Sequence, residues 1–202
     1  MAIVCPYAPE AWGPWSLEQG IGGSEEAVVR LSRALSRRGH DVTVYGSGWT
    51  GEDGPVRYKP LHEFTAVDVL LGWRYPEIFG QIRAFDAAWK ALWLHDSIEP
   101  ARVQMAAPFV DAIWCISDYH ANLYKDIPKI YSGRNGIDAE EFSDGIERNP
   151  LKMVYISSPV RGLEHLLKDH WPAIRRRLPK AELHCYYGWA SADRMGVTSS
   201  GI

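Results

Sequence analysis

Short apolar runs alternate with amphipathic stretches along most of the chain. The run "AIVC" at residues 2–5 has the unbroken apolar character of a buried parallel strand. After a long connection, a helix beginning near Ser24 carries its apolar side chains on one face, and Gly39 is its stop signal. The run "HDVTVYG", residues 40–46, predicts the next strand. These pieces form a strand-helix-strand unit, which in parallel sheets is nearly always right-handed.

The same alternation continues through the first two-thirds of the chain. Further strands are expected at 56–59, 67–71, 90–95, 111–116 and 129–132, and helices near 77–86, 100–108 and 117–125. Strands that alternate with helices predict the α/β class, with a Rossmann-like, doubly wound parallel sheet.

A polar stretch, "SDGIERNP" at 143–150, predicts a linker that ends a first domain of residues 1–142. Beyond it, residues 151–189 contain one strand-helix-strand pattern, which is an incomplete second unit. Residues 190–202 lose all periodicity and are predicted to be a disordered tail. An isolated unit of this kind leaves its sheet edges open, so we expect 151–189 to pack on the first domain or, in preference, on another copy of the chain.

Composition narrows the class of protein. Apolar residues make up 46% of the chain and charged residues 23%, with a net charge of −3, which is typical of a globular protein without a basic face for nucleic acid. The three cysteines are far apart and lie in expected strands, which indicates neither a disulfide framework nor a zinc site and favours a reducing, cytoplasmic compartment. No apolar run reaches the roughly 18 to 20 residues of a membrane span. Peripheral membrane contact stays open.

The connection after the first strand is long for such a fold, and long connections are usually functional. It carries Trp12 and Trp15 and ends at Gly22-Gly23, where glycine permits a backbone conformation or a close approach that larger residues forbid. The helix that follows points its free amides at whatever binds there. The alternative is that Ser24 caps the helix while the acidic residues after it favour its positive end.

Other strand ends carry polar residues that can meet a ligand. They are "GWRYPE" with Trp73 and Arg74, "LHDS" with His95, Asp96 and Ser97, "ISDYH" with Ser117, Asp118 and His120, and "SGRNGID" with Arg134, Asn135, Gly136 and Asp138. A histidine there can hydrogen-bond a substrate or be a structural imidazole, while Ser117 is better explained as a helix cap. Nothing in the sequence matches a Walker loop, a nucleophile elbow or a metal-ligand cluster, so no bound metal or cofactor is expected.

Several of these motifs stand in the order seen in glycosyltransferase family 4, a retaining group with the GT-B fold. The chain resembles that family in "GIGGSEEAVVRLSRALSRRGHDVTVYG", "WLHDS", "ISDYH", "RNGID" and "SSPVRGLEHLLKDHWPAIRRRLPKAELHCYYGW". The resemblance covers residues 1–189. It implies two Rossmann-like domains, the first mainly holding an acceptor and the second mainly holding a nucleotide-sugar donor, with a UDP-, GDP- or ADP-sugar as substrate and a glycan or small molecule as acceptor.

The resemblance also implies roles for single residues. Gly22 and Gly23 resemble the loop near the donor phosphates and the acceptor, and His95 resembles the histidine beside the transferred sugar. Arg161 resembles the basic residue that neutralises the leaving diphosphate, a role that suits its permanent charge. The run Asn135-Gly136-Ile137-Asp138 resembles the segment that closes the first domain and leads to the hinge. Trp12 and Trp15 are candidates for acceptor contact without a matching family residue.

The departures from the family define the alternative. Members of the family are longer, and their second domain carries a spaced pair of glutamates that holds the donor, which this sequence does not contain. Lys168 is the candidate for a further basic residue after Arg161. The sequence therefore leaves two functions open: a retaining glycosyltransferase, or a shortened relative that binds a sugar nucleotide or a glycan without turnover.

Overall fold

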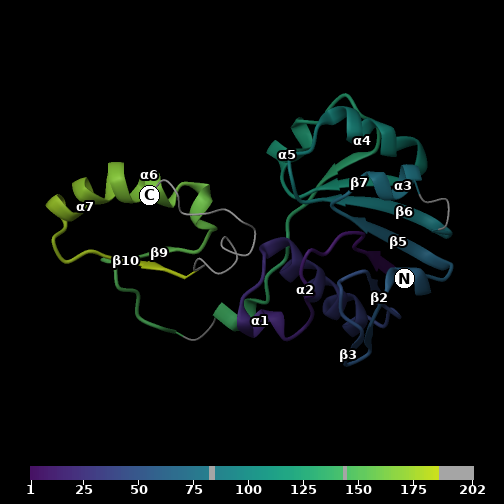
Figure 1. Ribbon diagram of the computed structural model, residues 1–202, viewed down its shortest axis with the longest axis horizontal. Helices are drawn as coiled ribbons and strands as arrows, with labels where there is room; N and C mark the ends of the chain where they lie inside the picture. Colours follow the sequence, from purple (N-terminus) through teal and green to yellow (C-terminus); the bar gives the residue numbers. More distant parts are fainter. Residues whose placement is uncertain (82–84, 143–144, 187–202) are drawn as a thin grey trace. The chain divides into compact units, whose positions relative to one another are not determined.

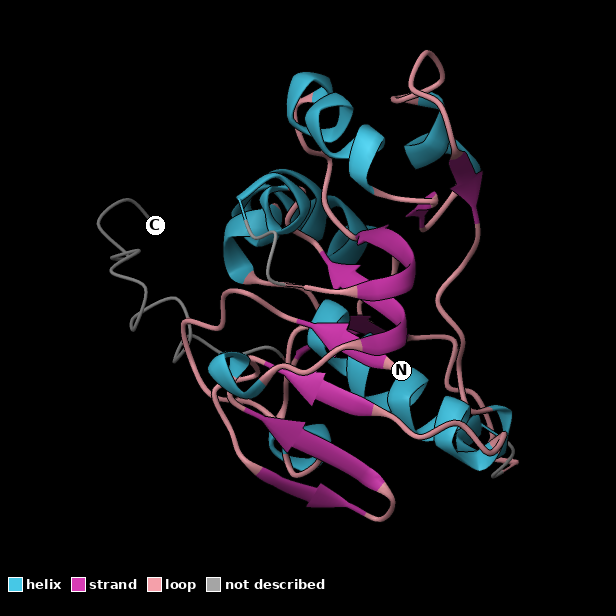
Figure 2. Cartoon of the chain, turned by 90° about the vertical axis from the view of Figure 1, so that its right-hand side faces the viewer, coloured by secondary structure: helices cyan, strands magenta, loops and turns pink. Residues whose placement is uncertain are grey.

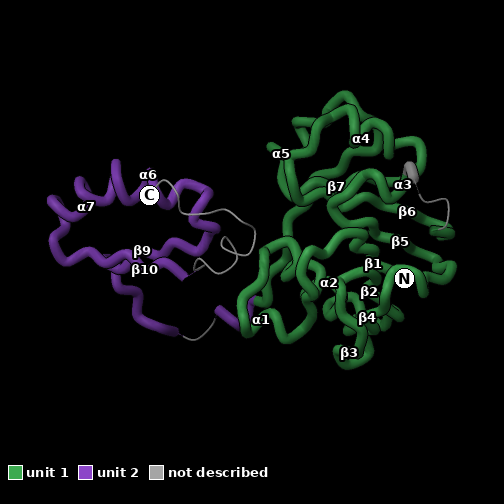
Figure 3. The backbone as a smooth tube through the Cα atoms, in the orientation of Figure 1, with its two compact units in different colours: residues 1–138 green, residues 139–202 purple. Residues whose placement is uncertain are grey.

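The computed structural model describes residues 1–81, 85–142 and 145–186. The chain forms two compact units, Met1–Asp138 and Ala139–Ile202 (Figures 1 and 3). The expected tail 190–202 and part of the expected linker lie outside the described residues.

Unit 1 is built on an eight-stranded sheet in the order β3-β4-β2-β1-β5-β6-β7-β8, with helices packed on it (Figure 2). Every neighbouring pair is parallel except β3 and β4. The strands are β1 Ala2–Val4, β2 Thr43–Tyr45, β3 Gly51–Asp53, β4 Val56–Lys59, β5 Val67–Trp73, β6 Ala87–Leu94, β7 Ala112–Cys115 and β8 Ile130–Ser132. The expected doubly wound parallel sheet is confirmed.

The helices of unit 1 cover both faces of this sheet. They are α1 Ser16–Gln19, α2 Gly23–Arg37, α3 Glu77–Gln81, α4 Pro100–Ala106 and α5 Asp118–Asn122, with short 3-10 turns at Leu61–Glu63 and Ala107–Phe109. Alternate residues of β1 enter different cores, since Ala2 and Val4 pack on one face and Ile3 and Cys5 on the other. The first core includes side chains of α3 and α4, and the second includes those of α2. Both faces are therefore apolar, which explains why the strands read as unbroken apolar runs.

Two elements of unit 1 differ from the sequence expectations. The long connection after β1 contains the short helix α1, because the Ser16 hydroxyl accepts a hydrogen bond from the Gly13 amide at 3.2 Å and fixes its first turn. The antiparallel strand β3 was also not expected, because "GED" has no strand-like pattern. Its place comes from pairing with β4 and from the Asp53 carboxylate, which Arg33 of α2 contacts at 2.6 and 3.1 Å.

Unit 2 contains the parallel pair β9 Lys152–Tyr155 and β10 Glu182–Cys185. The single helix expected between them is divided into α6 Leu163–His165, a π-turn Leu166–His170 and α7 Trp171–Arg177, after 3-10 turns at Ala139–Phe142 and Pro159–Arg161. Pro172 explains the division, since proline has no amide for the helix ladder and its ring clashes with the carbonyl one turn before it.

Gly46, directly after β2, is expected to be a sensitive position for stability. Its φ is +84°, and a Cβ there would lie 2.2 Å from the carbonyl oxygen of Cys5. Gly46→Ala should lower the free energy of unfolding by about 3 kcal/mol or more, since backbone must move in addition to the left-handed strain. Urea unfolding measures the loss.

Gly54 provides the matched control for Gly46. Its φ is +56°, but a Cβ there meets nothing within 4 Å, so Gly54→Ala carries only the backbone strain of about 1 kcal/mol. Equal losses in the two variants would contradict the close approach of Cys5 to Gly46.

Candidate functional site

The candidate site lies where the order of the strands reverses. Strand β1 sits between β2 and β5, and in open parallel sheets ligands bind at the carboxyl ends of the strands beside such a switch. Three segments meet there: the start of α2, the residue after β5, and the residues after β6. Side-chain contacts between Glu25, Arg74 and Asp96 join the three.

The first turn of α2 offers free amides. Gly22 is the N-cap and no side chain caps the helix, so the first backbone bond runs from the Glu26 amide to the Gly22 carbonyl at 2.9 Å. Ser24 does not cap the helix, which corrects that alternative, and its hydroxyl donates instead to Glu25 at 2.9 Å. The amides of residues 23–25 thus stay available for an anion.

Glycine stands at positions 22 and 23 for different structural reasons. Of the two expected alternatives, the special backbone conformation is not found, because neither glycine has a left-handed φ. The close approach holds for Gly22, because a Cβ there would lie 2.3 Å from Oε2 of Glu25. Gly23 is exposed, and a Cβ there would meet nothing within 4 Å, which leaves open space over the first turn of α2.

Arg74 ties the three segments together. Its Nε donates to Asp96 at 2.6 Å, and its Nη1 lies 3.2 Å from Glu25. The guanidinium lies over the Trp73 ring at 5.0 Å, and the backbone adopts a left-handed φ of 68°. A non-glycine residue in this conformation is held by its surroundings and is common at binding sites. Arg74 is therefore the fixed cation of the site, between two carboxylates.

His95 follows β6 and faces the tryptophans of the same core. Its ring contacts Trp93 and Trp73 edge to face, with centroids 4.4 and 6.3 Å away. Within the described structure its buried Nε2 has no hydrogen-bond partner. Burial, and next the charge of Arg74, lower the pKa of His95 to about 4. The imidazole is therefore neutral at pH 7.

The low pKa of His95 predicts a specific loss of stability in acid. Unfolding returns the pKa to its ordinary value near 6.5, so the unfolded chain binds the proton first and stability falls as the pH drops from about 6.5 toward 4. His95→Gln should lose less stability than the wild type between pH 7 and pH 5 in urea unfolding. The exposed His62→Gln is the control and should follow the wild type; identical pH dependence in all three proteins would contradict the buried neutral imidazole.

His120 and Ser117 support the loop that carries Asp96. Nε2 of His120 donates to the Asp96 carbonyl at 3.0 Å, while its Nδ1 accepts from the Ile116 amide at 3.4 Å. The Ser117 hydroxyl accepts from the His120 amide at 3.1 Å and caps α5, as the cap interpretation predicted. A direct contact of Ser117 with substrate stays a prediction.

The tryptophans of the first loop pack against the sheet. Trp12 is only 5% exposed and its ring lies 5.9 Å from Trp73, so its role in the structure is packing. Trp15 is half-buried, with its ring 4.8 Å from Trp49. Acceptor contact by either ring stays a prediction, and Trp15 has the accessible surface for it.

The segment after β8 is exposed. Arg134, Asn135 and Gly136 lie in it, and β8 is the edge strand of the sheet. Across the described residues, no hydrogen bond joins this segment to Arg74 or His95. A role in closing the domain stays a prediction.

Arg161 belongs to unit 2. It ends the 3-10 turn Pro159–Arg161, is exposed, and forms no ion pair with the described residues of the chain. Its guanidinium is thus available for an anion. Lys168, the candidate for a second basic residue, instead donates to the Glu164 carboxylate at 2.5 Å, so its ammonium group is already paired.

In the sequence, Arg74 and Asp96 are recognisable only as residues near strand ends, and Glu25 only as an acidic residue at a helix start. Their association depends on the order of strands, which brings α2, β5 and β6 to one rim. An arginine and two acidic residues, each at the end or the start of an expected element, indicate a polar cluster. Which of them pair with one another can be known only once the order of the strands is known.

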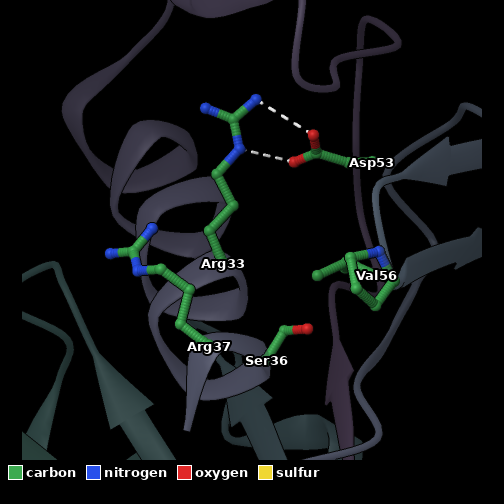
Figure 4. Close-up of a pocket in the computed structure, with 6 residues that line it drawn as sticks. Arg33, Ser36, Arg37, Asp53 and Val56 are labelled. Atoms are coloured by element: carbon green, nitrogen blue, oxygen red, sulfur yellow. Dashed lines mark hydrogen bonds and ion pairs between the residues drawn. The ribbon is translucent and has the colours of Figure 1, made fainter. Parts of the chain in front are cut away.

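A small pocket of about 170 Å³ lies elsewhere on unit 1 (Figure 4). Figure 4 shows Arg33 of α2 reaching Asp53, with Ser36 and Arg37 one turn further along the helix and Val56 opposite. Val56 begins β4, so this pocket is at the amino ends of the parallel strands. Its arginine is already paired with Asp53, and it plays no part in the candidate site.

The described residues contain no group of three or more His, Cys, Asp or Glu that could share a metal ion. In the same residues, every helix is too short or too polar to cross a membrane.

Comparisons with known proteins give one family match and a similar solved structure. The family model for Glycosyltransferase Family 4 matches residues 21–95, a range that begins just before Gly22 and ends at His95. No curated protein matches the chain. A solved structure, HepE of Anabaena in complex with UDP, matches with a TM-score of 0.56 at 14% identity.

The match covers 97% of this chain and 64% of HepE, so the chain spans less than two thirds of that protein. At this identity the likeness shows the fold. The family match over residues 21–95 agrees with the resemblance drawn from the sequence, so this part of the chain is similar to glycosyltransferase family 4, and the rest is supported at the level of the Rossmann-like fold.

Proposed function

We propose that the chain acts in a retaining glycosyltransferase that transfers a sugar from a nucleotide-sugar donor to a hydroxyl acceptor. One observation carries this proposal: the free amides of α2, the fixed cation Arg74 and the neutral His95 converge at the carboxyl rim beside β1. The free amides suit a diphosphate, Arg74 holds the Glu25 and Asp96 carboxylates in place beside them, and a neutral imidazole suits the hydroxyls of a sugar.

The donor is proposed to be a UDP-sugar, with GDP- and ADP-sugars as the alternatives. UDP is the ligand of the HepE structure, which has the same fold. In this proposal the phosphates lie near Gly23, His95 contacts the transferred sugar, and Arg161 neutralises the leaving diphosphate. The charge that grows on the leaving oxygen is what fixed donors stabilise most effectively.

The test is release of nucleoside diphosphate by the purified chain. UDP-, GDP- and ADP-sugars are supplied in turn with a panel of glycan acceptors, and a coupled assay measures the diphosphate. Retention is tested by the anomeric configuration of the product in its NMR spectrum. Release of diphosphate from none of these donors, or an inverted product, would count against the proposal.

The second candidate function is binding without turnover. Calorimetry that detects binding of a sugar nucleotide or glycan, in a chain that releases no diphosphate, would favour it over the enzyme.

We further propose that the chain is cytoplasmic. We also propose that it self-associates through unit 2. Val154, Ile156 and Tyr186 are 58%, 72% and 62% exposed, which leaves large apolar side chains in water around a two-stranded sheet. Sedimentation velocity should show concentration-dependent dimers that Ile156→Asp weakens. A wild-type chain that stays monomeric at high concentration would contradict self-association.

A further inference from the structure

Two histidines and an aspartate gather on unit 2, outside the site described above. His165 ends α6, and His170 ends the π-turn Leu166–His170. Their Nε2 atoms lie 3.1 Å apart, and the rings meet edge to face with centroids 4.7 Å apart. Both residues are exposed, so packing of a core does not explain the pair.

The backbone brings the pair together. On an α-helix with 3.6 residues per turn, side chains five positions apart point to different sides. In a π-turn the ladder runs from i to i+5, so residues five apart lie on neighbouring turns of one face. His165 and His170 have this spacing and span this turn. π-turns within helices occur frequently at functional sites.

Asp169 fixes the hydrogen on one of the two rings. Its carboxylate contacts Nδ1 of His165, so Nδ1 donates and Nε2 presents its lone pair toward His170. A histidine held in this way by a carboxylate is the usual arrangement of a metal ligand. The neighbouring Glu164 is paired with Lys168 and does not compete for the ring.

The separation of the two nitrogens is close to that of two ligands on a shared ion. Bonds of about 2.0–2.1 Å to one ion place two imidazole nitrogens about 2.8–3.0 Å apart at the octahedral angle and about 3.3–3.4 Å apart at the tetrahedral angle. The observed 3.1 Å lies between these values, so a shift of a few tenths of an ångström brings the two nitrogens to either geometry. Because the described residues hold no group of three ligands, water must complete the coordination.

We propose that His165 and His170 form a two-histidine binding site for a divalent transition-metal ion of the Zn²⁺ class, with Asp169 as the positioning residue. Imidazole nitrogens favour such ions over Mg²⁺ or Ca²⁺. When the ion binds, the hydrogen of His170 moves through solvent from Nε2 to Nδ1. Both rings stay neutral, and the ion exchanges two of its water ligands for the two nitrogens.

The test is titration of the whole chain with Zn²⁺ alone in a buffer without chelating groups, followed by calorimetry. The wild type should bind one Zn²⁺ at this site, and His165→Ala and His170→Ala should each weaken that binding at least tenfold. Asp169→Asn should weaken it about tenfold to a hundredfold, the range for loss of a carboxylate behind a ligating histidine.

His184→Ala is the matched control. His184 is in the same unit and contacts Glu182 at 2.9 Å, so its variant should bind Zn²⁺ as the wild type does. Long-range ¹⁵N spectra of the imidazoles add a direct readout, in which Zn²⁺ shifts Nε2 of His165 and His170. The proposal is overturned by wild-type affinity in His165→Ala or His170→Ala, by no binding up to millimolar Zn²⁺, or by Nε2 resonances that do not move. Circular dichroism establishes that each variant is folded.

Discussion

Replacing His95 with alanine is expected to reduce turnover of the sugar nucleotide by about a hundredfold or more, the usual loss when one fixed polar contact to the reacting group is removed. In the proposed function a substrate hydroxyl pairs with the buried Nε2, which has no partner among the described residues. Burial and Arg74 keep the ring neutral, with a pKa of about 4, so the loss should be the same from pH 6 to pH 8. Diphosphate release under saturating donor measures it.

The control for this prediction is the exposed His40→Ala, which removes an imidazole from the loop before β2. It should turn over as the wild type does. If His95→Ala also kept wild-type kcat with only a raised KM, His95 would bind the ground state alone, and its proposed role beside the transferred sugar would be wrong.

Arg161→Ala is expected to reduce diphosphate release by about a hundredfold to a thousandfold, since it removes a cation from the leaving group. Arg161→Lys should recover part of the loss, because an ammonium keeps the charge without the planar fork. The guanidinium is exposed and forms no ion pair with the described residues, so the substitution breaks no ion pair of the described structure.

Arg177→Ala is the control for Arg161, since it removes an exposed arginine from the last turn of α7 in the same unit. It should leave turnover unchanged. Equal rates in Arg161→Ala and the wild type would refute the role of Arg161 and leave the fold and the His95 prediction standing.

The fold follows from the sequence where burial is strong. The apolar runs of β1, β5 and β6 are buried on both faces, and their pattern predicts a parallel sheet. Helix α2 was predicted for the same reason, from its apolar stripe. By contrast, β3 has no apolar side chain, and its conformation depends on pairing with β4 and on the Arg33–Asp53 contact between distant positions.

The site was predicted only in part. His95 and Gly22-Gly23 stand at predicted strand and helix ends, so their position at one rim followed from the fold class. The bridge from Arg74 to Glu25 and Asp96 did not follow, because it depends on which strands are neighbours. The His165–His170 pair was not predicted, because residues five positions apart point to different sides of a regular α-helix. The π-turn before Pro172 brings the two rings together.

The central claim is that a nucleoside diphosphate binds at the carboxyl rim of the sheet, over the first turn of α2. Titration of ¹⁵N-labelled chain with UDP, followed by amide chemical shifts, tests it most directly. We expect the largest shifts at Gly23, Ser24 and Glu25. Shifts confined to the opposite rim, around Arg33 and Asp53, would contradict the account.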